Sequence, residues 1–119
     1  VQPVEYSALA AEQGGESSAD IRARVMEARA LQLKRYEGTG VRCNADLPGG
    51  MLRRYCRMDT GAERLLRGAF ERMGYSARAY DRILRVARTI ADLDHSKIIT
   101  AVHLSEVLQY RSLDRSNRP

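Results

Sequence analysis

Large aromatic side chains are scarce in this sequence of 119 residues, which contains no tryptophan, one phenylalanine and six tyrosines. A hydrophobic core must therefore rest on leucine, isoleucine, valine, alanine and methionine. That set of residues favours helices over sheets. Because a chain of this length is typical of a single domain, the composition predicts one helical domain with a modest core.

Lysine is almost absent as well. Only Lys34 and Lys97 occur among 20 basic residues, so arginine carries the net charge of +5. The flat guanidinium group binds phosphates and carboxylates in a two-pronged manner that lysine cannot match. The arginine excess is therefore compatible with phosphate recognition, with an acidic partner surface or with solubility, and net charge alone does not choose among them.

Cysteine is limited to Cys43 and Cys56, which form no C-x-x-C pair. Their spacing relative to His95 and His103 matches no usual zinc pattern, so we expect no metal site. Two reduced thiols are typical of a cytoplasmic protein, and neither a signal peptide nor an apolar run of transmembrane length occurs, so no membrane partner is expected. The chain starts at Val1 rather than at methionine, and we expect it to be part of a longer protein.

The parts of an ATP-hydrolysing site are missing. No G-x-x-x-x-G-K-[ST] loop occurs, Gly14-Gly15 and Gly49-Gly50 are predicted to be turn glycines, and no acidic strand end of the Walker B type is visible. The chain should therefore neither hold Mg-ATP tightly nor hydrolyse it. We expect no catalytic residue in this chain and no enzymatic activity of the chain by itself.

Helix signals begin after an irregular segment at residues 1–16, in which Val1 to Tyr6 resemble a strand end. The S-S-A-D pattern at residues 17–20 is a capping motif, and Gly38-Thr39-Gly40 predicts the end of the helix that follows. Four residues at helical spacing predict one inward face for this helix, namely Ile21, Val25, Ala28 and Leu31.

Two further helices are predicted beyond a loop at residues 41–48. A short helix is expected over 49–57, and a capping box at Thr60–Glu63 predicts a longer one that Gly74 ends. The short helix should point Met51, Leu52 and Tyr55 inward. The longer helix has an apolar stripe of Leu65, Leu66, Ala69, Phe70 and Met73.

The next helix is predicted over residues 77–93, with Ser76 as its N-cap. Its apolar side comprises Tyr80, Ile83, Leu84, Ala87, Ile90 and Ala91, and its opposite side Arg78, Arg82, Arg85 and Arg88. A turn at 94–99 leads to a last helix that Thr100 caps, with Leu104, Val107 and Leu108 inward. With a flexible tail at 112–119, the pattern predicts an all-α bundle of four to five helices over residues 17–111.

Several separated blocks of the sequence agree in order and spacing with one known family. They are Ser18–Val25 with Ala28-Arg29, Ser76–Leu84 with Val86–Leu93, and His103-Leu104 with Gln109–Arg111. Over roughly residues 4–115 the chain resembles the C-terminal domain of the magnesium chelatase-like, ComM (YifB-type) AAA+ ATPase family. The resemblance implies a lid-type helical bundle, with residues 1–16 as the connector from an ATPase core and Val1 to Tyr6 as the exit from its last strand.

The pattern is also similar to the lid of the replicative MCM helicases, in which a small hydroxyl residue, any residue and an arginine open a lid helix. The resemblance therefore places the nucleotide-sensing (sensor-2) arginine at Arg78. The chemistry is consistent with this role because Ser76 as N-cap puts Arg78 in the first turn, where unpaired N–H groups and the helix dipole attract anions. The guanidinium would hold the γ-phosphate of ATP in a neighbouring core and release it after hydrolysis.

The resemblance also implies the partners and cofactors. ATP and Mg²⁺ would be bound only in the full-length protein, by an upstream ATPase core, and neighbouring subunits would complete a homo-oligomeric ring. ComM-like members point to DNA processing, with DNA as a further partner of the full-length protein. The family name also implies magnesium chelation into a porphyrin, but no residue pattern in this chain supports a porphyrin site.

Other residues allow two interpretations. Ser76, Arg82, Arg85, Arg22 and Arg24 are candidate anion or interface contacts, but a cap and solvated arginines explain them equally. Arg88 is predicted to lie on the same outer face as Arg82 and Arg85.

The cluster of Arg53, Arg54 and Arg57 near Tyr55 is a faint nucleic-acid signal or an ordinary surface. His103 is expected to be a surface or capping-turn residue. The alternative function is a stand-alone basic helical domain that binds nucleic acid or a protein partner.

Overall fold

The computed structural model describes residues 17–116, with side chains for residues 17–110. This part of the chain has five α-helices and two short 3₁₀ turns, and its only strand-like pairing is an isolated bridge between Met58 and Ile99. The elements are α2 (Ser18–Arg35), η1 (Asn44–Asp46), η2 (Gly49–Met51), α3 (Leu52–Tyr55), α4 (Thr60–Met73), α5 (Ala77–Leu93) and α6 (Ala101–Ser116). The predicted all-α fold is confirmed, while the predicted connector at 1–16 lies outside the described residues.

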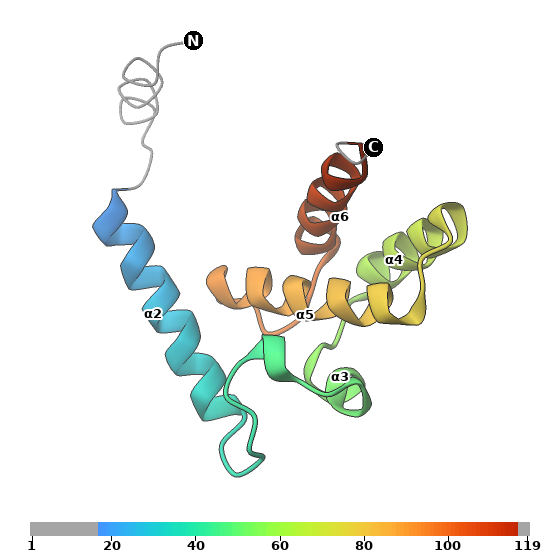
Figure 1. Cartoon of the computed structure of the whole chain (residues 1–119). Helices are drawn as coiled ribbons and strands as arrows, with labels where there is room; N and C mark the ends of the chain where they lie inside the picture. The colour runs from blue at the N-terminus through green and yellow to red at the C-terminus, as the bar shows by residue number, and fades with distance from the viewer. Residues whose placement is uncertain (1–16, 117–119) are drawn as a thin grey trace.

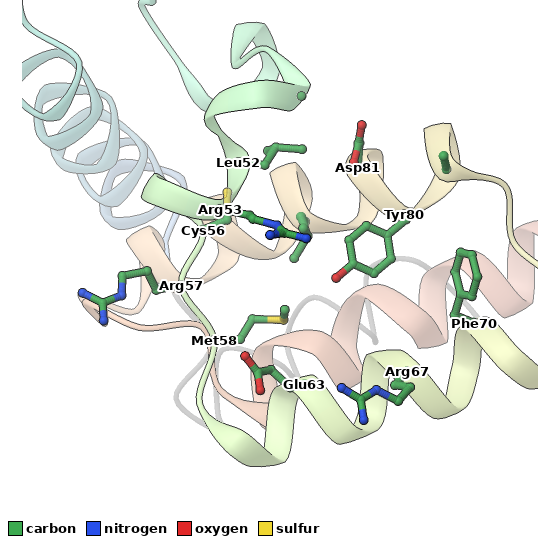
Figure 2. Close-up of a pocket in the computed structure, with 13 residues that line it drawn as sticks. Leu52, Arg53, Cys56, Arg57, Met58, Glu63, Arg67, Phe70, Tyr80 and Asp81 are labelled. Atoms are coloured by element: carbon green, nitrogen blue, oxygen red, sulfur yellow. The ribbon is translucent and has the colours of Figure 1, made fainter.

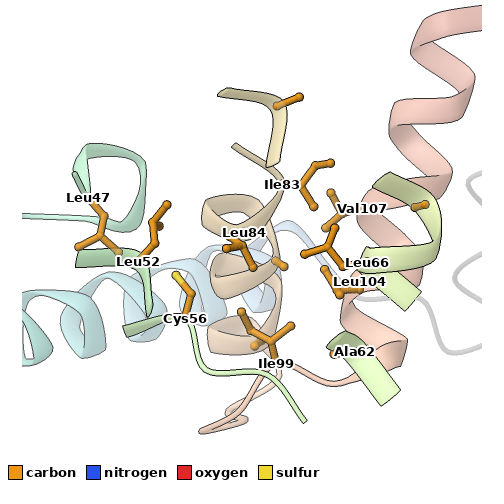
Figure 3. Close-up of a cluster of buried hydrophobic side chains, with 14 of the residues drawn as sticks. Leu47, Leu52, Cys56, Ala62, Leu66, Ile83, Leu84, Ile99, Leu104 and Val107 are labelled. Carbon is orange, nitrogen blue, oxygen red and sulfur yellow. The ribbon is translucent and has the colours of Figure 1, made fainter. Parts of the chain in front are cut away.

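Helix α5 occupies the centre of the bundle (Figure 1). Helices α2, α3 and α6 all contact it, and α4 packs against α6. The apolar side predicted for α5 is buried at Ile83, Leu84, Ala87 and Ala91. They belong to one core cluster, and Figure 3 shows Ile83 and Leu84 among the apolar side chains of the surrounding elements, which include Leu47, Leu52, Leu66, Leu104 and Val107. The helical spacing of the apolar residues therefore determines which side of α5 forms the core.

Side-chain caps fix the start of each long helix. Ser17 Oγ accepts a hydrogen bond from the Asp20 N–H at 3.1 Å, which confirms the predicted start of α2. For α4 the predicted cap is wrong, because the carboxylate of Asp59 rather than Thr60 accepts from the Ala62 N–H, at 2.7 Å. Since the Asp59 N–H bonds to the Ile99 carbonyl, the chain is still extended at Asp59, and its negative charge suits the positive helix end.

Left-handed residues end helices α4 and α5. Gly74 has φ 63°, as its predicted role requires, and His95 has φ 57° directly after the C-cap of α5. The Ser96 N–H bonds to the Ala91 carbonyl at 2.8 Å and the His95 N–H to the Asp92 carbonyl at 3.0 Å. This is a Schellman motif with histidine in the position that usually holds glycine, which explains why the sequence shows no glycine stop there.

The side chain of His103 caps the start of α6. The Thr100 N–H donates to His103 Nδ1 at 2.9 Å, while the Leu104 N–H bonds to the Thr100 carbonyl. His103 is buried, so it is a capping-turn residue, and the expectation that it lies on the surface is wrong. The helix continues to Ser116 and includes part of the segment that the sequence assigns to a tail.

Fewer apolar side chains of α2 are buried than its helical spacing predicts. Of the four residues expected to face inward, only Ala28 is buried, whereas Ile21, Val25 and Leu31 are 47%, 37% and 38% exposed. The reason is that α2 contacts α5 only along part of its length, and its N-terminal half extends beyond the bundle (Figure 1). Among the described residues, no helix combines the length and the apolar character needed to cross a membrane.

Candidate functional site

The side chain of Arg78 is exposed in the first turn of α5, the helix that begins at Ala77. Ser76 Oγ accepts from the Ala79 N–H at 3.1 Å, as predicted, and the N–H groups of Ala77 and Arg78 belong to the unpaired first turn. Within residues 17–110 no hydrogen bond or ion pair engages the Arg78 guanidinium. The fold therefore presents an exposed, permanent positive charge at the anion-attracting end of its central helix.

A groove of about 840 Å³ lies beside this helix end, between α3, α4 and the first half of α5 (Figure 2). Ala77, the neighbour of Arg78, lines one end of it, and Phe70 and Tyr80 pack edge to face with ring centres 5.8 Å apart. The remaining lining residues are Gly49, Leu52, Arg53, Cys56, Arg57, Met58, Glu63, Arg67, Asp81 and Leu84. Arg78 itself does not line this groove.

The other candidate anion contacts do not gather around Arg78. Arg82 is exposed on the same helix, whereas the Nε–H of Arg85 is used within the domain, since it donates to the Leu47 carbonyl at 2.8 Å. Arg22 and Arg24 are exposed on the N-terminal half of α2. Because α2 lies against the opposite end of α5 from Arg78 (Figure 1), the structure separates these two arginines from the candidate sensor.

Arg88 is not on the outer face, so that prediction is wrong. Its side chain is 2% exposed, and its Nε–H donates to Asp92 Oδ1 at 3.2 Å. It also donates to the carbonyls of Ser96, at 2.5 Å, and Lys97, at 2.9 Å. The turn between α5 and α6 folds back over this position and supplies these acceptors. Burial lowers the pKa of Arg88, and the negative charge of Asp92 opposes that effect.

Asp92 is the centre of a buried polar network that the sequence analysis missed. It is fully buried and receives two hydrogen bonds from Arg35 of α2, at 2.5 and 3.0 Å, in addition to the one from Arg88. Burial lowers the pKa of Arg35, but the hydrogen bonds and charge of Asp92 outweigh that effect, so the pKa is raised. The spacing of Arg88 and Asp92, four residues apart on one helix, was the available signal for this pair.

Asn44 connects the predicted loop to this network. Its Nδ2 donates to Asp92 Oδ2 at 2.8 Å and to Thr89 Oγ1 at 3.0 Å, and its Oδ1 accepts from the Tyr36 hydroxyl at 2.5 Å. The Asn44 N–H donates to Gln32 Oε1 at 3.0 Å. The network joins α2, η1 and α5 with its polar groups paired, so it holds the fold together rather than forming a reactive site.

The residues considered for metal binding are spread out. Within the described residues no three histidine, cysteine or acidic side chains converge on one point. Cys43 and Cys56 are free thiols, His95 Nε2 lies 3.2 Å from Glu27, and His103 Nε2 lies 3.0 Å from Asp94 Oδ2. The two histidines therefore make contacts within the domain.

The two thiols should differ in reactivity. Burial raises the pKa of Cys56 to about 11, and the side chain is 3% exposed, whereas Cys43 is partly exposed. Because only the thiolate attacks alkylating agents, iodoacetamide at pH 8 should modify Cys43 and leave Cys56 intact in the folded chain. Peptide mass spectrometry before and after unfolding in urea checks this prediction. Equal modification of both thiols without urea would contradict it.

The architecture and the helix end define the class: an all-helical domain with an exposed arginine in the first turn of its central helix. Sequence comparison gives the family. The profile of the family described as magnesium chelatase, subunit ChlI C-terminal, matches residues 15–111, and the chain belongs to this family. The resemblance drawn from the sequence blocks is thereby confirmed.

Curated relatives agree with this assignment. The chain is 45% identical over 101 residues to the protein YifB of Escherichia coli and 39% identical over 101 residues to the competence protein ComM of Haemophilus influenzae. Each match covers 85% of this chain but 19% of the relative. The chain thus corresponds to the C-terminal domain of much longer proteins.

Proposed function

We propose that this domain is the lid of an AAA+ ATPase, with Arg78 as its sensor-2 arginine. The observation that carries the proposal is the exposed Arg78 guanidinium, which no described residue engages, in the first turn of α5. In this arrangement the lid packs on the nucleotide site of a core domain outside this sequence. Arg78 and the open N–H groups of the helix end then face the γ-phosphate.

The packing of α5 explains how a contact at Arg78 moves the domain. The same helix carries the buried residues Ile83, Leu84, Ala87 and Ala91 and, at its other end, Asp92, which binds Arg35 of α2. A shift at the first turn of α5 therefore carries α2 and α6 with it as one rigid unit. Loss of the γ-phosphate after hydrolysis removes the contact and allows the lid to swing.

In the full-length protein we propose a cytoplasmic ring in which the core binds ATP and Mg²⁺ and neighbouring subunits complete the assembly. DNA processing is the proposed task, in keeping with the resemblance to ComM-like proteins. The test of the sensor role is the ATP turnover of the full-length protein with Arg78→Ala, compared with Arg82→Ala. Arg82 is a suitable control because it is exposed on the same helix about one turn further along.

The second candidate function is direct binding of nucleic acid, which the net charge of +5 and the exposed Arg53, Arg54 and Arg57 favour. If the domain is a lid, the isolated chain should bind DNA no more tightly than the non-specific range of about 10⁻⁴ to 10⁻⁶ M at physiological salt. Fluorescence anisotropy with single- and double-stranded DNA at several salt concentrations measures this. Nanomolar binding that weakens steeply with salt would favour the second candidate.

A further inference from the structure

The groove between α3, α4 and α5 is lined by apolar side chains and by arginines of different elements, among them Arg53 of α3 and Arg67 of α4. Leu52, Met58 and Leu84 contribute the apolar surface. Figure 2 shows Arg53 extending over the groove from α3, and Arg67, which lies along α4, also lines it. A volume of about 840 Å³ lies within the range of about 300 to 1,000 Å³ that is typical of ligand-binding pockets.

The polar groups of this groove lack partners within residues 17–110. Neither Arg53 nor Arg67 forms an ion pair there, although Glu63 lies four residues before Arg67 on α4. The hydroxyl of Tyr80 points into the groove and forms no hydrogen bond with the described residues (Figure 2). Two guanidinium groups and a phenol hydroxyl next to apolar side chains are suited to an anionic group carried next to an apolar one.

We propose that this groove is a docking site for an acidic peptide segment that inserts an apolar side chain between Arg53 and Arg67. The apolar side chain packs on Met58, Leu52 and the ring of Phe70. Carboxylates on either side of it pair with the two arginines and the Tyr80 hydroxyl. This proposal does not depend on the role of Arg78, which lies outside the groove.

A peptide fits the groove better than a nucleic acid does. Glu63 and Asp81 are also part of the lining, and their carboxylates repel the regularly spaced phosphates of a nucleic-acid strand. The aromatic rings of Phe70 and Tyr80 are packed edge to face at 85°, so they do not form a stack of parallel faces for successive bases. An acidic peptide can place its carboxylates at the arginines alone and present apolar groups elsewhere.

The test is a selection of random dodecapeptides displayed on phage, with the folded chain as bait. The enriched sequences should combine aspartate or glutamate with one large apolar residue. A synthetic peptide of the consensus sequence should bind about tenfold more weakly to the Arg53→Glu and Arg67→Glu variants, measured by fluorescence polarisation.

Matched controls separate the groove from overall charge. Arg54→Glu and Arg64→Glu make the same charge change on α3 and α4, but neither residue lines the groove, so the affinity should stay within about twofold of the original chain. Arg78→Ala should also leave the affinity unchanged. Circular dichroism of each variant shows that the helices are retained.

Three outcomes would overturn the proposal. The first is the absence of enrichment over the bare support, and the second is enrichment of basic or purely apolar peptides. The third is an oligothymidylate that binds the chain and is lost in Arg53→Glu and Arg67→Glu but not in the two controls, which would assign the groove to single-stranded nucleic acid instead.

Discussion

ATP turnover by the full-length protein should fall by roughly 10- to 1,000-fold when Arg78 is replaced by alanine, somewhat less than the loss of an arginine finger. The physical reason is that a guanidinium at the open first turn of α5 stabilises negative charge on the transferred phosphate. The Arg78 side chain is exposed and forms no hydrogen bond or ion pair with the described residues, so the helical fold should stay intact. Steady-state ATP hydrolysis, with circular dichroism of the same protein, measures both effects.

Two further variants make this experiment specific. Arg82→Ala removes an exposed arginine from the same helix and should change turnover by less than about twofold, because it lies outside the first turn. Arg78→Lys keeps the charge but loses the two-pronged geometry, and it should give an intermediate rate. Normal turnover with Arg78→Ala would remove this residue from the mechanism and would contradict the proposed sensor role.

Replacing Asp92 by alanine should cost about 3 to 5 kcal/mol of folding stability, because it leaves the buried Arg88 without its partner. The carboxylate accepts hydrogen bonds from Arg35, Arg88 and Asn44, and it is fully buried. Without it the Arg88 guanidinium, which is 2% exposed, has no counter-charge in a buried position. The midpoint of urea unfolding, followed by circular dichroism, measures the loss.

Asp94→Ala is the matched control because it removes a carboxylate from the same sequence region. Its side chain is 72% exposed, and its pair with His103 should contribute less than about 1 kcal/mol. If Asp92→Ala fails to fold, the double variant Arg88→Met with Asp92→Leu removes both charges and should regain part of the stability, since apolar side chains can replace a buried ion pair. Equal unfolding midpoints for Asp92→Ala and Asp94→Ala would show that the network contributes little.

Local sequence signals predicted the helices well where the signal and its effect lie within a few residues. Ser76 and Gly74 mark the boundary between α4 and α5 because a cap and a left-handed residue act on their own helix ends. The α4 cap was placed one residue late at Thr60, because the bond from the Asp59 N–H to Ile99 comes from a segment distant in the sequence. A capping pattern in the local sequence gives no information about that hydrogen bond to a distant segment.

The candidate site was predicted in part. The first-turn position of Arg78 follows from the Ser76 cap alone, whereas its exposure depends on the packing around α5. The groove beside it was not predicted, because Arg53 and Arg67 belong to different helices whose approach depends on the packing of α3 and α4 around α5. No spacing in the sequence indicates that these two side chains line the same groove.

The sequence by itself determined that the described part of the chain is helical, where α2 and α5 start and which side of α5 is apolar, because these properties depend on neighbours within one or two turns. Only the tertiary structure decided that Arg88 is buried on Asp92 and that Ile21 and Val25 remain exposed. Both outcomes depend on which parts of neighbouring segments pack against these positions. A polar residue is buried only where a distant segment supplies its partners, and an apolar residue only where a distant segment covers it.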